Sequence, residues 1–355
     1  MDRPDFTRGT AVVTGAATAA MHAPSWQPDL LGEGYRQHVI ELGADPDGEG
    51  SIAAVLVRRE PRAGEVARGA VLYVHGFSDY FFQTALADSF AAQGMAFYAV
   101  DLRKSGRARR SGQTAHYVSD LALCDKELDS ALGIVGGEHP DMPVILVAHS
   151  TGGLIVPLWL DRRHAAGRMP PVAGVVLNSP WFDLQGKPVH RGPLTQALRV
   201  LAKAQPFREL KLAPGIYGQT LHISGTGEWD FDLGLKPLAG FPVTIGWLNA
   251  VRRGHARLHR GLDIGVPSLV LRSSRSHFSG DYSALSDRAD TVLDVRQIAR
   301  WAGCLGAEST VVPIQDARHD VFLSLPEPRK YAYAVLAAWL DRHQLTLSAG
   351  RELAG

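Results

Sequence analysis

Short apolar runs that alternate with helical patterns are the feature of this sequence that most limits its fold. Five of the runs are continuous, as expected for strands that are buried on both faces of a sheet. They span residues 69–77, 96–103, 143–149, 172–180 and 267–274. Two more helices are expected at about 291–305 and 327–343, on either side of a short strand at 309–314. This alternation predicts an α/β fold with a mostly parallel central sheet flanked by helices on both faces.

A long insertion separates two of these predicted strands, 172–180 and 267–274. Its helical pieces are broken by proline and glycine, and it is far longer than an ordinary loop. Because ligands of α/β sheets bind outside the carboxyl ends of the strands, we expect the insertion to form a helical cap over that edge. The expected organisation is an N-terminal arm at 1–35, a core at 36–180 and 263–355, and an inserted cap (lid) at 181–262.

Composition and charge exclude several classes of protein. Hydrophobic residues make up 45% of the 355 residues and charged residues 21%, which predicts an ordinary packed core. The formal net charge of +1 gives no sign of a nucleic-acid partner. Two cysteines, Cys124 and Cys304, make neither a disulfide framework nor a metal knuckle and fit a reducing compartment. Without an H-E-x-x-H pattern or a phosphate-cradling loop, we expect no metal, nucleotide or other cofactor.

The N-terminal sequence lacks the features of a secretory signal. MDRPDFTRGT places acidic residues and a proline where a signal would be basic, and the stretch AVVTGAATAAM after it is short and built of small residues. No window reaches the length and apolarity of a transmembrane segment. We therefore expect a cytoplasmic protein with no transmembrane segment, and the sequence does not indicate its oligomeric state.

A polar step interrupts the apolar pattern after the run 143–149. The stretch Ala148-His149-Ser150-Thr151-Gly152 matches the nucleophile-elbow pattern G-x-S-x-G, with alanine in place of the first glycine. Such a turn exposes the serine hydroxyl, and it needs small residues on both sides because strand and helix backbones nearly touch there. A glycine-rich loop with an incidental serine is the alternative. The strand and helix on either side favour Ser150 as a nucleophile, with His149 packing or hydrogen bonding beneath the turn.

Four stretches together carry a family resemblance. VLYVHGFSDY, AFYAVDLRKSGRA, VILVAHSTGGL and DARHDVFLS follow one another in the order of the α/β-hydrolase fold. Over roughly residues 39–343 the chain resembles the branch of lysophospholipase-like and monoacylglycerol-lipase-like serine hydrolases, which is also grouped with serine aminopeptidases. The resemblance implies an α/β-hydrolase fold and a catalytic triad in the chain order serine, acid, histidine.

A serine nucleophile needs a base, and the base needs an orienting acid. His319, in QDARHDVF after the strand at 309–314, has the place that the fold order gives the base, although a surface histidine in a turn would look the same. The acid should follow the strand at 267–274, where four aspartates occur: Asp281, Asp287, Asp290 and Asp294. The segment ADTVLDV resembles the acid-bearing turn of the family, which implies Asp290. Asp183, in SPWFDL one strand earlier, is the topological alternative.

An oxyanion hole needs two backbone N–H groups aimed at the developing negative charge. One is expected from Thr151, the residue after the nucleophile. The resemblance assigns the other to Phe77, which follows His75 and Gly76. Gly76 would let that backbone turn inward, and the Phe77 side chain would face the acyl or leaving-group pocket. A plain turn is the alternative.

These residues predict a serine hydrolase that cleaves a carboxylic ester through an acyl-enzyme. The expected partner is a small-molecule ester with an apolar group, such as a monoglyceride or a lysophospholipid-like ester. The same triad could serve an amidase or aminopeptidase, an acyltransferase or a C–C bond hydrolase. A homologue that binds a ligand without catalysis is the remaining alternative. Dehalogenases and epoxide hydrolases are disfavoured, because they use aspartate where Ser150 stands.

Two basic stretches have less specific patterns. DLRKSGRARR, at 101–110, carries five basic residues after a predicted strand and could hold an anionic head group. We favour a solvated loop, which is the commoner origin of such a run. VRRGHARLHRG in the predicted cap is basic at helical spacing and could touch a lipid surface, but a cap helix with a solvated face is again favoured.

Overall fold

A nine-stranded sheet dominates the computed structural model, which describes residues 24–185, 199–211, 215–306 and 308–352. The described strands lie in the order β1-β2-β3-β5-β4-β6-β7-β8-β9. Pairing is antiparallel from β1 to β5 and parallel from β5 to β9. The mostly parallel α/β sheet is thus confirmed. The strands are β1 Gln27–Pro28, β2 Tyr35–Ala44, β3 Ser51–Arg59, β4 Gly69–Val74, β5 Met95–Asp101, β6 Val144–His149, β7 Val172–Asn178, β8 Ser268–Ser273 and β9 Ser309–Ile314.

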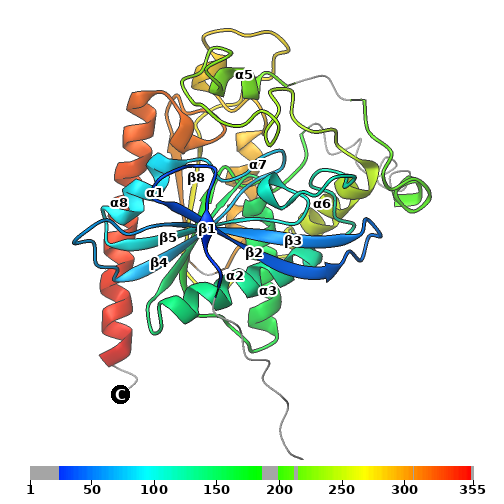
Figure 1. The fold of residues 1–355 in the computed structure, drawn as a ribbon. Helices are drawn as coiled ribbons and strands as arrows, with labels where there is room; N and C mark the ends of the chain where they lie inside the picture. Colours follow the sequence, from blue (N-terminus) through cyan, green and yellow to red (C-terminus); the bar gives the residue numbers. More distant parts are fainter. Residues whose placement is uncertain (1–23, 186–198, 212–214, 307, 353–355) are drawn as a thin grey trace, which may run out of the picture.

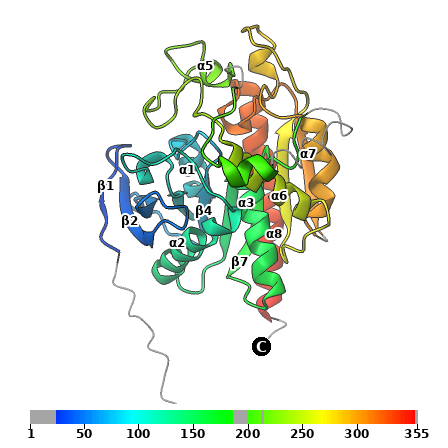
Figure 2. The ribbon, with the colours of Figure 1, turned by 90° about the vertical axis from the view of Figure 1, so that its right-hand side faces the viewer.

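Helices cover both faces of the sheet (Figures 1 and 2). The labelled helices of the whole structure are α1 Thr84–Ala91, α2 Asp125–Glu138, α3 Gly152–Ala165, α5 Tyr217–Leu221, α6 Ile245–Leu258, α7 Val295–Trp301 and α8 Pro326–Glu352. Side chains alternate between the faces: Leu72 and Leu146 share a core with α2 and α3, whereas Val71 and Ile145 share one with α1 and α8. All residues of β4 and β6 are therefore buried, which explains their continuous apolar runs.

The observed elements refine the expected domain boundaries. β1 pairs with β2, so part of the range expected as an N-terminal arm belongs to the sheet, while residues 1–23 lie outside the described part. Within the expected cap, α5 lies above the sheet edge in Figure 1. The helix α6 instead buries Val251 and Leu258 in the same cluster as Leu154 of α3. The division into arm, core and cap remains a prediction.

The preference for a solvated loop at 101–110 is wrong, because three of its five cations are buried in ion pairs. Arg103 pairs with Glu127, Lys104 with Asp45 and Glu49, and Arg107 with Asp29 and Asp101. The side chain of Lys104 is fully buried. Except for Asp101, which belongs to the segment itself, the acidic partners are distant in sequence. The pairs hold the loop after β5 against the sheet instead of leaving it free for an anion.

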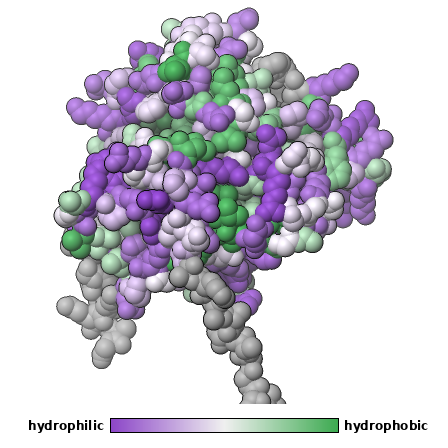
Figure 3. All heavy atoms as spheres, in the orientation of Figure 1, coloured by the Kyte–Doolittle hydropathy of each residue, from purple (hydrophilic) through white to green (hydrophobic). Residues whose placement is uncertain are grey.

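The surface mixes polar and apolar residues. Figure 3 shows hydrophobic residues on this face interspersed with hydrophilic ones, several of the hydrophobic residues in its upper part. Among the large apolar residues that are exposed, two groups come from the cap and from the connection between β8 and α7: Ile223 and Leu233, and Phe278, Tyr282 and Leu285. In the described ranges, no helix combines the length and apolarity that crossing a membrane requires.

Candidate active site

Ser150 lies in a strained turn between β6 and α3. Its φ of +51° is in the left-handed region, which L-residues with a side chain rarely adopt. Two backbone hydrogen bonds hold the turn to the segment after the neighbouring strand β7: Ser150 N–H donates to the Asn178 carbonyl at 3.0 Å, and Trp181 N–H donates to the Ser150 carbonyl at 2.9 Å. The sequence-predicted elbow turn is thus present as a strand–turn–helix with Ser150 at its tip.

Close backbone approach explains the small residues around the turn. A Cβ on Gly152 would lie 2.5 Å from the His75 carbonyl oxygen, and one on Gly153 would lie 2.7 Å from Cβ of Pro180. A Cβ on Gly76 would lie 2.8 Å from Cβ of Ser150. The loop after β4 therefore passes directly over the serine, at van der Waals contact, which only glycine at position 76 permits.

His319 and Asp290 form a buried pair at the same edge of the sheet. His319 Nδ1 lies 2.8 Å from Asp290 Oδ2, and both side chains are almost fully buried. The other carboxylate oxygen, Oδ1, accepts hydrogen bonds from the backbone N–H groups of Val292 and Leu293 at 2.8 and 2.7 Å. The His319 ring lies 4.8 Å from the ring of His149, the neighbour of Ser150. Asp290 and His319 are thus paired close to the turn that carries Ser150, at the edge where β6, β8 and β9 end.

The other candidate aspartates are directed elsewhere. Asp183 accepts hydrogen bonds from Trp301 Nε1 at 3.2 Å and from the backbone N–H of its neighbour Leu184. Asp287 pairs with Arg318 at 2.8 Å. Asp294 accepts from a backbone N–H at the start of α7, where it is the N-cap. Asp281 is exposed in the loop. Within the described residues, Asp290 alone is paired with His319.

The loop His75–Ser78 is held in place from beneath, with Phe77 turned toward the cap helix α6. Leu102 N–H donates to His75 Nε2 at 3.0 Å, so this nitrogen carries no proton, and His75 Nδ1–H donates to the Gly76 carbonyl at 2.7 Å. That carbonyl belongs to the same peptide as the Phe77 N–H, so the bond also fixes the direction of this N–H. The Phe77 ring packs on Trp247 of α6 at 4.0 Å.

The two predicted oxyanion donors are available. Neither the Phe77 N–H nor the Thr151 N–H donates a hydrogen bond to another residue in the described part of the chain. Thr151 immediately precedes α3, so its N–H lies at the positive end of that helix dipole. Two such donors beside Ser150 are what stabilisation of an oxyanion requires.

A buried network behind His319 was not anticipated from the sequence. Asp320 is almost fully buried and accepts from Asn178 Nδ2 at 2.6 Å and from Gln83 Nε2 at 3.4 Å. Its own backbone N–H donates to Tyr217 Oη of the cap at 3.1 Å. The partners lie 142, 237 and 103 residues away in sequence, so no local pattern could reveal them. The network fixes the position of the turn that carries His319 relative to β7 and to α5, within the range expected as a cap.

A buried ion pair ties the cap to the loop after His75–Ser78. Lys236 Nζ lies 2.7 Å from Asp79 Oδ1, and both side chains are almost completely buried. Burial acts to raise the pKa of Asp79, but the Lys236 ammonium opposes this effect, and the pKa lies below its usual value. Asp79 therefore stays ionised, and the pair fixes the segment around Lys236, within the range expected as a cap, to the loop after β4.

His149 has the role expected of it beneath the turn. Its Nδ1 lies 3.1 Å from the Asn178 carbonyl, to which it donates. Burial lowers its pKa, more strongly than nearby Asp320 raises it, so the ring is neutral. A neutral ring that donates to a carbonyl supports the turn without competing with His319 for a proton.

Comparisons with known proteins agree with this architecture. The family model described as "Serine aminopeptidase, S33" matches residues 65–280, more than half of the chain. Among curated relatives, a monoacylglycerol lipase of Mycolicibacterium smegmatis is 34% identical over 150 residues, covering 42% of this chain and 47% of that protein. Phospholipase YtpA of Bacillus subtilis is 28% identical over 119 residues, covering 33% and 42%. The chain thus spans about half the length of the curated relatives it matches.

Solved structures extend the likeness over most of the chain. A soluble variant of monoglyceride lipase from Saccharomyces cerevisiae, in complex with a substrate analogue, has a TM-score of 0.59 at 17% identity and covers 91% of this chain and 97% of its own. The monoacylglycerol lipase of Paleococcus ferrophilus has a TM-score of 0.57 at 21% identity and covers 79% and 96%. At these identities the likeness shows the fold alone. With the match to the family model, it establishes that the chain has the α/β-hydrolase fold and belongs to the serine aminopeptidase, S33 family.

Proposed function

We propose that the chain is a serine hydrolase that cleaves a carboxylic ester through an acyl-enzyme. The observation that carries this proposal is the 2.8 Å contact between His319 Nδ1 and Asp290 Oδ2, at the sheet edge where Ser150 stands in its strained turn. Serine, acid and histidine in this chain order are what a triad on this fold requires. The names of the curated relatives, a monoacylglycerol lipase and a phospholipase, support an ester as the substrate.

The proposed mechanism follows from the proton positions that this contact favours. Asp290 is an acceptor, so His319 Nδ1 carries the proton and Nε2 is free to act as a base. Nε2 takes the proton of Ser150 as Oγ bonds to the ester carbonyl carbon. The proton then passes to the leaving alcohol as the C–O bond breaks. Water, deprotonated by the same nitrogen, releases the carboxylic acid and restores the Ser150 hydroxyl.

The negative charge of the tetrahedral intermediate needs donors that are already in position. We assign them to the Phe77 and Thr151 N–H groups, which have no other described acceptor. The His75 contact with Gly76 keeps the Phe77 peptide from rotating. These steps use only groups of the chain and ask for no cofactor. An apolar group on the ester remains our expectation, and so does a cytoplasmic location.

The first experiment is hydrolysis of p-nitrophenyl esters by the wild type and by Ser150→Ala. Ser179→Ala is a matched control, because Ser179 follows β7, is fully buried and also has a left-handed φ, of +45°. We expect Ser150→Ala to lose turnover and labelling by a fluorophosphonate probe, and Ser179→Ala to keep both. A folded wild-type protein that neither turns over any ester nor reacts with the probe would refute the proposal.

The same assay separates the other reactions that this triad could perform. Aminoacyl p-nitroanilides test for amidase or aminopeptidase activity, and an added alcohol that diverts the acyl group to a new ester tests for acyl transfer. Faster turnover of the anilides than of the matched esters would replace the ester assignment by an amide. A ligand retained at unit stoichiometry without turnover would instead support a binding protein.

A further inference from the structure

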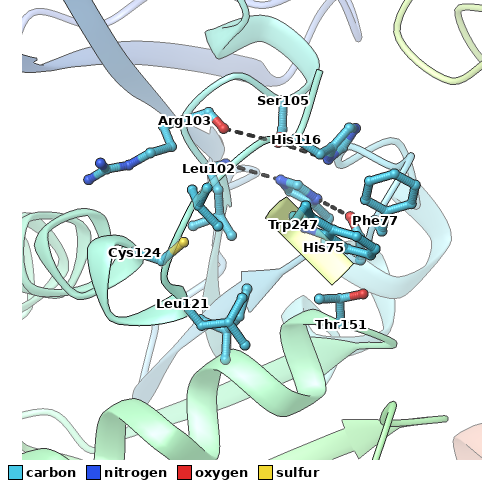
Figure 4. Close-up of a pocket in the computed structure, with 13 residues that line it drawn as sticks. His75, Phe77, Leu102, Arg103, Ser105, His116, Leu121, Cys124, Thr151 and Trp247 are labelled. Atoms are coloured by element: carbon cyan, nitrogen blue, oxygen red, sulfur yellow. Dashed lines mark hydrogen bonds between the residues drawn. The ribbon is translucent and has the colours of Figure 1, made fainter. Parts of the chain in front are cut away.

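A small cavity opens beside the proposed oxyanion hole (Figure 4). Its volume is about 30 Å³, and apolar side chains make up most of its wall. Phe77 and Thr151 border it, and Trp247 of α6 closes it from the cap. Most of the remaining wall comes from the segment between β5 and α2, including His116, Leu121 and Cys124. The cavity is therefore continuous with the groups that would hold the substrate carbonyl.

Sheet topology places this cavity on the acyl side of the proposed reaction. In the sheet order, β5 lies on one side of β6, and β8 and β9 lie on the other. Ser150 follows β6, whereas Asp290 and His319 follow β8 and β9. A leaving alcohol must lie within reach of His319 Nε2 to receive its proton. The alcohol therefore occupies the β8 side, and a group that enters the cavity on the β5 side belongs to the acyl part.

Three lining residues carry a buried polar atom with no partner among the described residues: Nε2 of His116, Oγ1 of Thr151 and Nη1 of Arg103. His116 is 7% exposed, Thr151 4% and Arg103 3%. A buried polar atom without a partner is unfavourable unless a ligand or a water molecule forms the missing hydrogen bond. Figure 4 shows the Arg103 guanidinium turned away from His116 and Phe77. Its Nε and Nη2 donate to Glu127, so its charge is paired even though Nη1 has no partner. The cavity thus offers hydrogen-bonding atoms without a free positive charge.

The hydrogen-bond network of His116 defines what the cavity accepts. Ser105 Oγ lies 3.2 Å from the Arg103 carbonyl, to which it donates, and 2.9 Å from His116 Nδ1. Both contacts are satisfied when His116 Nδ1–H donates to Ser105 Oγ, and this leaves Nε2 as an acceptor. Burial lowers the pKa of His116 well below its usual value. A neutral acceptor selects a hydroxyl donor and rejects a carboxylate.

We propose that this cavity is an acyl subsite for a short chain that carries a hydroxyl group, with the hydroxyl donating to His116 Nε2. The inference rests on the proposed function and narrows its substrate class. A volume of about 30 Å³ holds about two or three groups the size of a water molecule. The acyl group then has roughly four carbons or fewer, and the apolar group expected on the substrate lies on the alcohol side.

The test compares kcat/KM for p-nitrophenyl butyrate with that for the 2- and 3-hydroxybutyrate esters, each as separate enantiomers. One net hydrogen bond to a neutral acceptor corresponds to about 5-fold, so at least one hydroxylated ester should exceed butyrate by about that factor. Because His116 Nε2 has one fixed position, the opposite enantiomer of that ester should not exceed butyrate. Activity on unsubstituted esters should fall once the acyl chain exceeds roughly four carbons.

Substitution of His116 tests whether a preference for hydroxylated esters depends on this side chain. His116→Asn is suitable because His116 has a φ of +58°, a region that asparagine also adopts readily. The shorter amide cannot reach the position of Nε2, so the ratio of hydroxylated to plain ester should fall to about one. His164→Asn, in the last turn of α3, is the matched control and should keep the wild-type ratio.

The outcomes separate this inference from the proposed function. Ester turnover by the wild type without preference for any hydroxylated enantiomer would overturn the subsite and leave the esterase intact. A preference that survives in folded His116→Asn, or activity that rises with acyl chains of eight or more carbons, would also overturn it. No turnover of any ester would contradict the function itself. The wild-type comparison decides the matter even if His116→Asn fails to fold.

Discussion

Replacing Asp290 by asparagine is expected to abolish the proposed catalysis by fixing the wrong tautomer of His319. Asp290 Oδ1 accepts two backbone N–H groups at 2.8 and 2.7 Å, and Oδ2 faces His319 Nδ1 at 2.8 Å. In Asp290→Asn the amide oxygen is the only acceptor, so it keeps the two N–H groups and turns the NH₂ toward His319. The NH₂ donates to Nδ1, the ring proton moves to Nε2, and Nε2 can no longer accept the proton of Ser150.

The expected loss is about 10⁴-fold in kcat, or about 5 kcal/mol of transition-state stabilisation. The fold should survive, because the two backbone hydrogen bonds that anchor the turn remain satisfied. The assay is steady-state hydrolysis of p-nitrophenyl butyrate, with thermal unfolding of each variant measured in parallel. A loss of activity with an unchanged unfolding temperature separates the tautomer effect from simple unfolding.

Asp183→Asn is the matched control for this change. Leu184 N–H donates to Oδ1 of Asp183 and Trp301 Nε1–H to Oδ2, so an asparagine keeps one of these two bonds and loses the other, and neither bond involves His319. We expect less than about 10-fold loss of kcat. The reasoning is refuted if Asp183→Asn loses about 10³-fold or more while Asp290→Asn stays within about 10-fold of the wild type.

Three further perturbations test the packing and charges around the site. Gly152→Ala should destabilise the protein by at least about 1–3 kcal/mol, because the added Cβ would lie 2.5 Å from a backbone carbonyl oxygen. In Gly136→Ala, in α2, the added Cβ has no atom within 4 Å, so this control should stabilise the protein by up to about 1 kcal/mol. Lys236→Met should cost about 3–5 kcal/mol by leaving the buried Asp79 carboxylate unpaired. Burial lowers the pKa of His255 to about 4. As the pH falls, His255 therefore takes up a proton in the unfolded chain before it does so in the folded protein, and the free energy of unfolding should fall between about pH 6.5 and pH 4. His255→Gln should reduce this dependence of the unfolding free energy on pH, measured by chemical denaturation.

Each of these three perturbations has a control variant that separates its cause from a general effect of substitution. Equal unfolding temperatures for the two glycine variants would contradict the close approach at the elbow turn. Arg253→Met removes an exposed ion pair with Asp120 and should change stability by less than about 1 kcal/mol, so an equal effect of Lys236→Met would contradict the burial argument. His164, which is exposed, provides the control for the pH measurements. His164→Gln should keep the wild-type dependence of the unfolding free energy on pH.

Much of the fold could be predicted because its signals are local. The run at 143–149 corresponds to β6 at Val144–His149, and the run at 309–314 to β9 over the same residues. A strand such as β6, which is covered on both faces, is apolar throughout, and this makes it visible in any short window. The elbow turn is equally local, because the approach of two backbones restricts consecutive positions around Ser150 to small side chains.

The candidate acid was only partly predictable. Several aspartates follow β8, and the sequence pattern alone favoured one of them through a family resemblance. In the structure, Asp290 is completely buried and faces His319, while Asp287 is taken by Arg318 and Asp294 caps α7. Which carboxylate meets the histidine depends on how the loop folds back onto the sheet, and that is a property of distant contacts.

The basic segment at 101–110 shows how composition can mislead. Five cations in ten residues are typical of a solvated loop, yet Lys104 is fully buried between Asp45 and Glu49. Its partners are 59 and 55 positions earlier in the chain and come from the turn between β2 and β3. Charge pairing over such a distance leaves no mark in a local window.

The sequence by itself determined the α/β class, the strand–turn–helix around Ser150 and the chain order of the proposed triad. Each of these depends on periodicity or on steric limits that act over a few neighbouring residues. Only the tertiary structure decided that Asp290 faces His319, that Lys236 closes onto Asp79 and that His116 presents an unpaired nitrogen to a small cavity. These are contacts between segments far apart in the chain, and burial, which the whole fold creates, gives them their energy.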